Sequence, residues 1–450
     1  MDFKRQISMY APKMVDRLST LVSYNSVQGE PEEGAPFGPV VKACLTKALQ
    51  MAEDDGFEVK DLDGYCGYAQ MGEGDQIIGI LAHLDVVPAG EGWNTDPFKT
   101  VIKDGRIYGR GVSDDKGAVV ASLCAMKIVR DSGIPLNKRV RLIMGCNEES
   151  GSKCLAHYVE TEGHIDMGFT PDGCFPGVHG EKGMVGATFS SKKTNIIDIN
   201  GGVAPNVVCN HCVTTVPAKS FSKRILENYF NNENITYEIT EDEEKAVLDV
   251  RGVAAHASTP HLGVNAISHT MVGLKTAGFQ DAFVDFYVSH LGLETDGESL
   301  GCKLQDEYGA LTLNNGMIFM KDGVITGTID IRFPVTLSSK KVISGMKLED
   351  EGGLITIHRT GEPLFFPVDS PLVSKLLKSY RKITGDMESQ PITMGGGTYA
   401  KGIHNCIAFG CEFPKGEDNH IHDANEWADL HELELQVAIY VEAIMALLED

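Results

Sequence analysis

A chain of 450 residues, 42% hydrophobic and 23% charged, is long enough for two or three domains and has the balance of a folded globular protein. Its formal net charge of −23 weighs against binding to nucleic acid or to anionic membranes. No stretch approaches the roughly 20 apolar residues that span a bilayer, and the first residues show no secretory pattern, so we expect a cytoplasmic protein.

The first part of the chain alternates helices and strands. Its apolar residues recur at helical spacing or form short uninterrupted runs between turn residues. In chain order the expected elements are a helix over Gly38–Met51, a buried strand over Gln76–Leu84, a helix over Lys116–Val129, and strands over Arg139–Cys146 and Ile165–Phe169. This alternation predicts an α/β sheet with helices on its faces.

The pattern changes after about Lys182 and changes back near Pro367. The segment between them is expected to be α+β, with helices over Lys223–Phe230 and Gly263–Gly273 and strands over Lys245–Val250 and Gly323–Phe333. Helix and strand then return over Ser370–Ile383, Cys406–Phe409 and His431–Leu448. We therefore predict one discontinuous α/β domain of residues 1–182 and 368–450, a mixed sheet flanked by helices, and an inserted α+β domain of residues 183–367.

The sequence His83-Leu84-Asp85 ends the first buried strand. Residues two apart in an extended segment point to the same side. Asp85 can therefore accept the second N–H of His83 and leave the other ring nitrogen free for a metal ion. The pattern is common by chance, so it indicates a site only together with partners from elsewhere in the chain.

The segment Gly109–Gly117 (GRGVSDDKG) places two aspartates, Asp114 and Asp115, directly before a predicted helix. A carboxylate at this place could bridge two cations. Aspartate is also a favoured helix N-cap without any metal, and for this segment taken alone the cap is the stronger explanation.

Further carboxylates and a histidine follow other expected strands or lie near the end of the chain. Glu148 and Glu149 follow the strand RVRLIMGC, Asp172 follows IDMGF, and His422 begins the segment HDANE. Adjacent carboxylates such as Glu148 and Glu149 repel each other unless a cation lies between them. A solvated acidic loop or a turn residue would explain each of them individually.

Together, two histidines and three or four carboxylates form a ligand set for two zinc-like ions. Two ions roughly 3.5–4 Å apart can share a hydroxide, and a free carboxylate nearby can accept a proton from it. Most of the set lies at strand ends, where open α/β sheets collect their ligands. The set therefore predicts a hydrolase with two divalent metal ions.

The ordered motifs HLD, GRGVSDDKG, NEESGS, TPD and HDANE resemble those of the co-catalytic zinc metallopeptidases, which include aminoacylase, glutamate carboxypeptidase, succinyl-diaminopimelate desuccinylase and carnosinase. Within that superfamily the chain looks most like the bacterial dipeptidases of the peptidase V type, over nearly its full length. The resemblance implies a catalytic domain of the zinc-exopeptidase type, an inserted lid domain and a monomer.

The resemblance also implies a role for each metal ligand. His83 and Asp172 would hold one ion, Glu149 and His422 would hold the other, and Asp114 would bridge the two. Zinc suits these ligands, and manganese or cobalt could occupy the same set.

Two further carboxylates would act beside the metals. By the same resemblance, Glu148 would be the general base and later the proton donor, and Asp85 would orient His83.

The inserted domain would supply substrate contacts. Its motif GVAAHASTP matches the family's lid, in which His256 would stabilise the oxyanion of the tetrahedral intermediate. The alternative is a surface histidine before a proline turn. Asn206 and Arg332 resemble the lid's substrate contacts, and Arg332 could grip a substrate carboxylate with two N–H groups. Thr398 and Tyr399 belong to the glycine-rich sequence GGGTY, which looks like the family's substrate loop.

These likenesses imply a metallodipeptidase that acts on short unblocked peptides through a two-metal-bound hydroxide. Aspartate at position 172 goes with dipeptidases and tripeptidases in this superfamily, whereas glutamate goes with acyl-amino-acid and succinyl hydrolases. The first alternative is an N-acyl-amino-acid deacylase or desuccinylase on the same scaffold. The second is a non-enzymatic metal- or peptide-binding protein, which would have no use for Glu148.

The eleven cysteines are scattered, several of them inside apolar runs, and we expect reduced structural thiols. Cys209 and Cys212 form a CxxC without a second pair nearby, so we do not expect them to bind a metal. No GxSxG elbow indicates a serine nucleophile.

Overall fold

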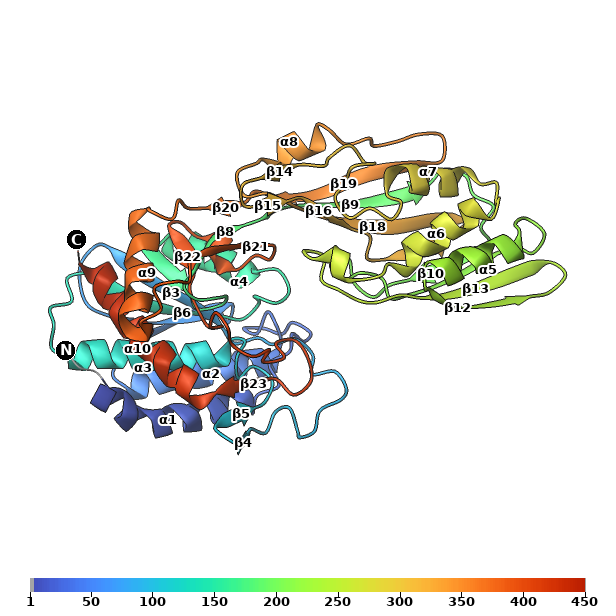
Figure 1. Ribbon diagram of the computed structural model, residues 1–450. Coiled ribbons are helices and arrows are strands. Elements are labelled where there is room, and N and C mark those ends of the chain that lie inside the picture. The colour runs from blue at the N-terminus through green and yellow to red at the C-terminus, as the bar shows by residue number, and fades with distance from the viewer. Residues whose placement is uncertain (1–3, 450) are drawn as a thin grey trace. The chain divides into compact units, whose positions relative to one another are not determined.

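The helices and strands of the computed structural model, which describes residues 4–449, group into two compact units (Figure 1). Unit 1 comprises the described parts of Met1–Gly180, Phe366–Ile392 and Gly397–Asp450, and unit 2 comprises Glu181–Phe365 and Thr393–Gly396. The expected boundaries of the insertion lie within two residues of the observed ones. No sequence signal marks residues 393–396 as part of unit 2.

Unit 1 contains a large sheet, a small sheet and the longest helices. Its helices are α1 (Lys4–Val22), α2 (Pro39–Asp54), α3 (Lys116–Asp131), α4 (Lys153–Glu162), α9 (Pro371–Thr384), the 3-10 helix η2 (Tyr399–Gly402) and α10 (Leu430–Leu448). The large sheet contains β1 (Glu58–Leu62), β2 (Cys66–Met71), β3 (Ile77–His83), β6 (Arg139–Gly145), β7 (Met167–Thr170), β8 (Val178–Glu181) and β22 (Cys406–Ala408). The small sheet contains β4 (Val101–Lys103), β5 (Arg106–Tyr108) and β23 (Trp427–Asp429). Two short strands lie where the chain passes between the units, β20 (Leu364–Phe365) and β21 (Ile392–Met394).

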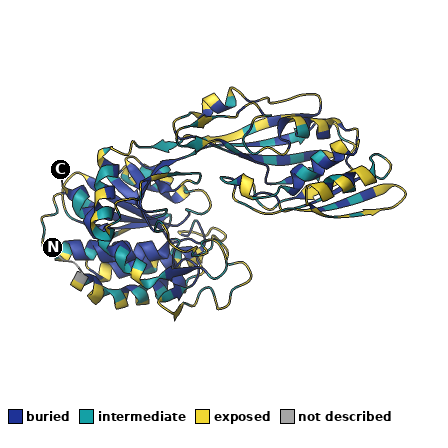
Figure 2. Ribbon diagram, in the orientation of Figure 1, coloured by how far each residue is buried: buried dark blue, intermediate teal, exposed yellow. Residues whose placement is uncertain are grey.

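The large sheet of unit 1 is mixed and runs in the order β1-β2-β6-β3-β7-β22-β8. The strands β6, β3, β7 and β22 are parallel to one another, whereas β1, β2 and β8 pair with their neighbours in antiparallel fashion. All seven residues of β3 are buried (Figure 2), as expected of a parallel strand covered on both faces.

Two neighbouring residues of β2 show that helices cover both faces of this sheet. A Cβ on Gly67 would lie 2.9 Å from Leu49 of α2. Tyr68 instead lies under the guanidinium of Arg141, which donates a hydrogen bond to Tyr158 of α4. Successive residues of a strand point to opposite faces, so α2 and α4 cover different sides of the sheet.

Unit 2 is α+β. Its large antiparallel sheet runs in the order β12-β13-β11-β10-β17-β18-β9-β19, and β16 pairs with β18. The strands are β9 (Gly183–Ser191), β10 (Asp198–Gly201), β11 (His211–Pro217), β12 (Thr236–Glu241), β13 (Lys245–Arg251), β16 (Thr312–Asn314), β17 (Ile318–Lys321), β18 (Val324–Phe333) and β19 (Gly353–Gly361), with β14 (Gln305–Asp306) and β15 (Gly309–Ala310) as a separate pair. The helices are α5 (Lys223–Asn232), the 3-10 helix η1 (Pro260–Leu262), α6 (Ala266–Thr276), α7 (Ala282–His290) and α8 (Ser339–Ile343).

The core of unit 2 lies between one face of its sheet and its helices. Along β9 and β13, buried residues alternate with more exposed ones, the pattern of a strand with one covered face. Leu248 of β13 packs in one cluster with Phe230 of α5, Met271 of α6 and Phe283 of α7. Because only one face of these strands is covered, their buried residues come at every second position, whereas the strands of unit 1 that are buried on both faces have continuous apolar runs.

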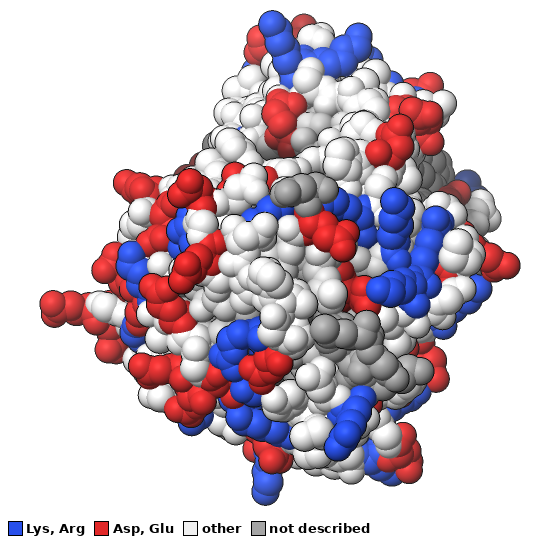
Figure 3. Space-filling model, turned by 90° about the vertical axis from the view of Figure 1, so that its left-hand side faces the viewer, with Lys and Arg blue, Asp and Glu red and all other residues white. Residues whose placement is uncertain are grey.

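The surface shows the acidic excess of the composition, and the cysteines form no disulfides. Acidic side chains are spread over much of the face shown in Figure 3, interspersed with Lys and Arg, in keeping with the net charge of −23. Between residues 4 and 449, no helix is both long and apolar enough to cross a membrane. All eleven cysteines are free, and the thiols of Cys209 and Cys212 are engaged with the His211 carbonyl and the Thr214 hydroxyl.

Candidate active site

Three parallel strands bring most of the expected ligands to one edge of the unit 1 sheet. His83 is the last residue of β3, and its register partner Gly145 is the last residue of β6. Glu148 follows β6 by three residues, and Asp172 follows Thr170 at the end of β7 by two. Because β6, β3 and β7 are parallel neighbours, the segments after them start at the same edge of the sheet.

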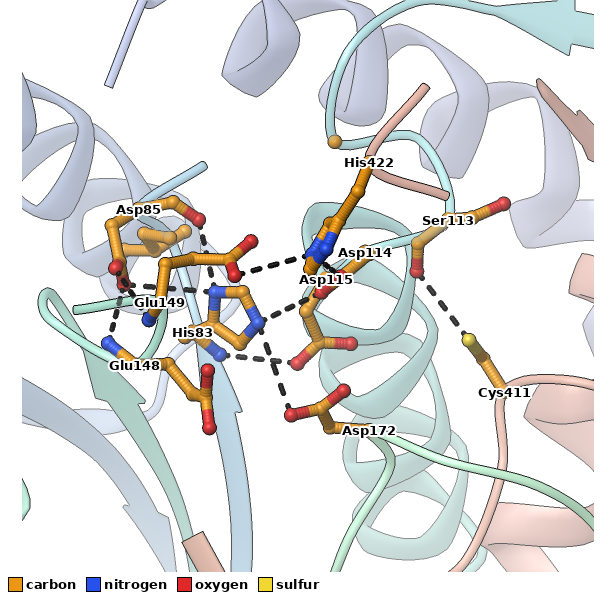
Figure 4. Close-up of polar contacts among 12 residues, drawn as sticks. His83, Asp85, Ser113, Asp114, Asp115, Glu148, Glu149, Asp172, Cys411 and His422 are labelled. Atoms are coloured by element: carbon orange, nitrogen blue, oxygen red, sulfur yellow. Dashed lines mark hydrogen bonds and ion pairs between the residues drawn. The ribbon is translucent and has the colours of Figure 1, made fainter. Parts of the chain in front are cut away.

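Two other segments complete the cluster (Figure 4). Asp114 precedes α3, and His422 lies before β23 in the C-terminal part of unit 1. Possible ligand atoms of His83, Asp114 and Glu149 all lie within 4.8 Å of one another, and so do those of His83, Glu148 and Asp172. The structure therefore brings together residues that are up to 339 positions apart in the sequence.

Asp114 lies between the two histidines and presents one oxygen to each. Its Oδ1 is 2.9 Å from Nε2 of His83, and its Oδ2 is 2.9 Å from Nε2 of His422. Asp172 Oδ2 lies 4.0 Å from the same nitrogen of His83, and Glu149 Oε2 lies 3.2 Å from that of His422. The cluster thus has two halves that share one carboxylate.

The ring of His83, which is 1% exposed, is held by the main chain of Asp85 rather than by its side chain. His83 Nδ1 lies 2.9 Å from the carbonyl oxygen of Asp85 and 3.6 Å from its carboxylate. A carbonyl oxygen can only accept, so Nδ1 carries a proton and Nε2 faces Asp114. The proton on Nδ1 therefore meets the Asp85 carbonyl and not the carboxylate that was expected to accept it.

The Asp85 carboxylate instead fixes the neighbouring pair of glutamates. Its Oδ1 accepts a hydrogen bond from the backbone N–H of Glu148 at 3.0 Å, and its Oδ2 accepts one from that of Glu149 at 3.1 Å. Asp85 thus touches two segments of the site, one through its main chain and one through its side chain.

The two aspartates before α3 could be metal ligands or helix caps, and the contacts of Asp115 distinguish their roles. Asp115 occupies the N-cap position, but its side chain makes no capping hydrogen bond. Its buried Oδ2 accepts the backbone N–H of His83 at 3.1 Å. Asp114 is therefore the aspartate that faces both histidines, and Asp115 supports the backbone of one of them.

The carboxylates strongly perturb the histidines. Burial lowers the pKa of His83, but the hydrogen bond with Asp114 and the negative charges of the nearby Asp114 and Asp85 carboxylates outweigh burial and raise that pKa well above its ordinary value. Hydrogen bonds with Asp114 and Glu149 raise the pKa of His422 to about 10. Burial raises the pKa of Asp114, but the two histidines lower it by more, so the net shift of this pKa is downward.

The glutamates show that the cluster has more acceptors than donors. Burial and the negative charges of Asp172 and Glu149 raise the pKa of Glu148 well above its ordinary value. Glu149 Oε1 is buried with no hydrogen-bond partner. An unpartnered buried polar atom costs about 1–3 kcal/mol, and a divalent cation bound by carboxylate and imidazole would satisfy it. The residues present therefore fit two divalent cations.

Tyr399 is not a substrate contact, and the expectation for it is corrected. Its side chain is 1% exposed, and its hydroxyl lies 3.0 Å from the Cys154 thiol. Its ring stands edge-on to His83 with centroids 6.3 Å apart. Tyr399 thus packs against His83 in the interior of unit 1, and its neighbour Thr398 begins η2 by accepting the N–H of Ala400.

Within unit 2, His256 is held in one tautomer. The backbone N–H of Ser258 donates to His256 Nδ1 at 3.2 Å, and the Ser258 hydroxyl lies 2.7 Å from the same nitrogen. Since Nδ1 accepts, the proton of the neutral ring is on Nε2. Gly395 belongs to this neighbourhood, because a Cβ on it would lie 2.3 Å from the Cβ of Ser258.

Arg332 is already engaged within unit 2. Its Nε and Nη2 donate to the two carboxylate oxygens of Asp330 at 2.6 and 3.0 Å, and Nη1 donates to the Gly395 carbonyl at 3.3 Å. Asp330 therefore takes the Nε–Nη2 edge, which is one of the two guanidinium edges that could bind a substrate carboxylate. Asn206 is exposed.

Two charged residues of the site motifs were left without a role by the sequence analysis. Arg110 of GRGVSDDKG and Glu426 of HDANE form a buried ion pair. The sequence did hold a clue to this pair, because a positive residue stands in one ligand-bearing motif and a negative residue in another.

Comparison with known proteins gives the family. Residues 79–446 match the model of peptidase family M20/M25/M40, a stretch that contains all the expected metal ligands. The chain belongs to this family. It is a hydrolytic enzyme of a metal-dependent family, and the resemblance found in the sequence motifs is confirmed.

Curated relatives cover nearly the whole chain. A Bacillus subtilis protein named "Putative dipeptidase YtjP" is 36% identical over 441 residues, which are 94% of each chain. A protein of Staphylococcus haemolyticus, also named a putative dipeptidase, is 34% identical over 467 residues, which are 99% of each chain.

Solved structures show the same fold. The di-peptidase Dug1p of Saccharomyces cerevisiae has a TM-score of 0.60 at 16% identity, over 99% of this chain and 98% of that one. Human carnosine dipeptidase 1 has a TM-score of 0.58 at 16% identity with the same coverage. A Staphylococcus aureus tripeptidase has a TM-score of 0.55 at 17% identity, over 98% of this chain and 99% of that one.

Metal binding at neutral pH is expected to release protons. Neighbouring carboxylates raise the pKa of both His83 and His422, the latter to about 10, which favours the protonated rings, whereas a histidine must be neutral to bind a metal ion. Saturation with Zn²⁺ at pH 7 should therefore release protons from these rings, with affinity rising as pH rises. Calorimetry in buffers of different ionisation enthalpy measures the number. His422→Ala should release about one proton fewer, and an unchanged number would contradict its place among the ligands.

Proposed function

We propose that this enzyme is a metallodipeptidase that hydrolyses the peptide bond of dipeptides with a free amino end. The observation that carries the proposal is the shared carboxylate of Asp114, with one oxygen toward each histidine and Glu148 beside them. The names of the similar curated proteins, and the dipeptidases and tripeptidase among the similar structures, support peptides as substrates.

The proposed ligand sets follow the two halves of the cluster. His83 and Asp172 would hold one ion, Glu149 and His422 the other, and Asp114 both. When bound, two divalent ions supply Lewis-acid chemistry, polarising the scissile carbonyl and acidifying water. We propose zinc as the native metal, since it prefers imidazole and carboxylate ligands, and manganese or cobalt would fit the same donors.

Glu148 would move the proton of the reaction. It would take a proton from the attacking water onto a carboxylate oxygen as the C–O bond forms, and give it to the leaving nitrogen as the C–N bond breaks. The hydrogen bond from its backbone to Asp85 would keep it in place while the proton moves.

Unit 2 would act as the lid and supply donors to the substrate. We propose that His256 donates from Nε2 to the developing oxyanion, since its tautomer already places a proton there. Asn206 and Thr398 remain proposed substrate contacts. Arg332 would bind a substrate carboxylate through the Nη1–Nη2 edge of its guanidinium, because Asp330 occupies the Nε–Nη2 edge.

A substrate panel tests the proposed function. Purified enzyme is assayed with dipeptides of alanine and histidine and, in parallel, with N-acetyl and N-succinyl amino acids. We expect hydrolysis of the dipeptides, loss of activity after chelation and recovery with zinc, manganese or cobalt. Hydrolysis confined to the acylated amino acids would establish the deacylase or desuccinylase alternative, and metal uptake without any turnover would establish a binding protein.

Glu148→Gln should separate proton transfer from metal binding. Glutamine keeps the size of the side chain but cannot accept the proton, so kcat should fall by about 10²–10⁴-fold. The bound metal, measured by elemental analysis, should stay at the wild-type level. Glu160→Gln, on an exposed position of α4, is the matched control and should keep full activity. Full activity of Glu148→Gln would refute the proposed base.

His256→Ala should reduce kcat by about 10²–10³-fold, since it removes a preorganised donor to the oxyanion. Metal affinity should not change, because all proposed ligands belong to unit 1. His261→Ala, which removes another exposed histidine of unit 2, serves as the control. Equal kcat values for the two variants would remove His256 from the mechanism.

A further inference from the structure

Arg110 and Glu426 form an ion pair that the proposed reaction does not use. Arg110 Nη1 donates to Glu426 Oε2 at 2.7 Å, and each side chain is 1% exposed. Transferring two charges out of water is costly, and apolar side chains often stabilise such a position as well or better. The pair is therefore best understood through the other groups that it holds.

The Glu426 carboxylate binds the backbone of the loop that carries Asp114. Gly111 N–H donates to both of its oxygens, at 3.1 and 3.0 Å. Ser113 and Asp114 donate their N–H groups to Oε1 at 2.9 and 3.2 Å. One side chain from the C-terminal segment thus fixes the loop up to the backbone of the shared carboxylate itself.

Arg110 extends this network toward the segment that follows His83. Its Nη2 donates to the carbonyl oxygens of Pro88 and Ala89 at 3.4 Å each. Gly111 also packs closely there, since a Cβ on it would lie 2.9 Å from Val86, and its φ of +88° suits glycine. The ion pair therefore joins three separate segments of the site.

Glu426 also anchors the segment of His422, which lies four residues before it. His422 and Asn425 have φ values of +66° and +65°, a backbone region that non-glycine residues rarely adopt. Asn425 secures the segment by accepting the N–H of Asn94 at 2.7 Å and donating to the Gly92 carbonyl at 3.1 Å. Such a backbone persists only where surrounding contacts determine it.

We propose that the Arg110–Glu426 pair is a positioning device that sets the separation of Asp114 and His422. The inference rests on the proposed ligand sets. The ion held with Glu149 has two of its three ligands, Asp114 and His422, on segments that Glu426 joins. The other ion has only one such ligand, Asp114. Loss of Glu426 therefore weakens the ion at Glu149 and leaves the other largely intact.

The test is a Zn²⁺ titration of metal-free protein by calorimetry, comparing wild type with Glu426→Gln. Glutamine keeps the size of the side chain, but removes the charge that pairs with Arg110 and turns one acceptor into a donor. We expect wild type to bind two ions. In the variant, the first ion should bind with wild-type affinity and the second about 10–100-fold more weakly. The Zn²⁺ concentration that gives half-maximal kcat should rise by the same factor.

Glu162→Gln is the matched control. It breaks another ion pair of unit 1, between Glu162 and Arg141 at 3.0 Å, away from the proposed ligands. A purely structural role of such a pair would lower the melting temperature and leave both metal affinities unchanged. An equal weakening of the second ion in Glu162→Gln and Glu426→Gln would overturn the inference.

The remaining outcomes are separable. If folded Glu426→Gln binds both ions as wild type does, the inference fails and the proposed function stands. If wild type binds fewer than two ions, the proposed function itself fails. Arg110→Lys keeps the positive charge but loses the planar donor fork, and should weaken the second ion by a smaller factor. If Glu426→Gln does not fold, this variant decides, and wild-type affinity for both ions in it overturns the inference.

Discussion

Four carboxylates and two imidazoles lie close together at one edge of the large sheet of unit 1. The electrostatic repulsion among the carboxylates is the constraint on which the rest of the site depends. Asp114, Glu148, Glu149 and Asp172 would repel one another as anions. Three other acidic residues fix the backbone beneath them by accepting main-chain N–H groups: Asp85, Asp115 and Glu426. The cluster therefore uses one set of carboxylates to hold the backbone of the site and another to face cations.

Much of this arrangement follows from the sequence because its signals are local. Uninterrupted apolar runs located β3, β6 and β7 to within about two residues, since strands buried on both faces need such runs. The ligand candidates were found because they directly follow these strands or form short motifs. The change from alternating helices and strands to an α+β pattern also separated the two units, with boundaries within two residues of those of the insertion in the structure.

What the sequence did not show depends on contacts between distant segments. The Asp85 carboxylate reaches Glu148 and Glu149 across more than 60 residues, and no local pattern distinguishes that use from a bond to His83. Tyr399 stands in a loop-like sequence, yet it is buried because Gly145 leaves room for its ring. The helix expected from Gly263 begins at Ala266, where Asn265 caps it with its side chain.

The discontinuity of unit 1 has a consequence for synthesis of the chain on the ribosome. Nearly all of unit 2 is one continuous stretch, so it can fold as soon as that stretch has emerged. Unit 1 must wait for β22 and α10, and His422 also follows the whole continuous stretch of unit 2 in the sequence. The nascent chain thus acquires the second half of its candidate ligand cluster only after residues 181–365 have been made, so unit 2 can fold before the hydrolytic centre is complete.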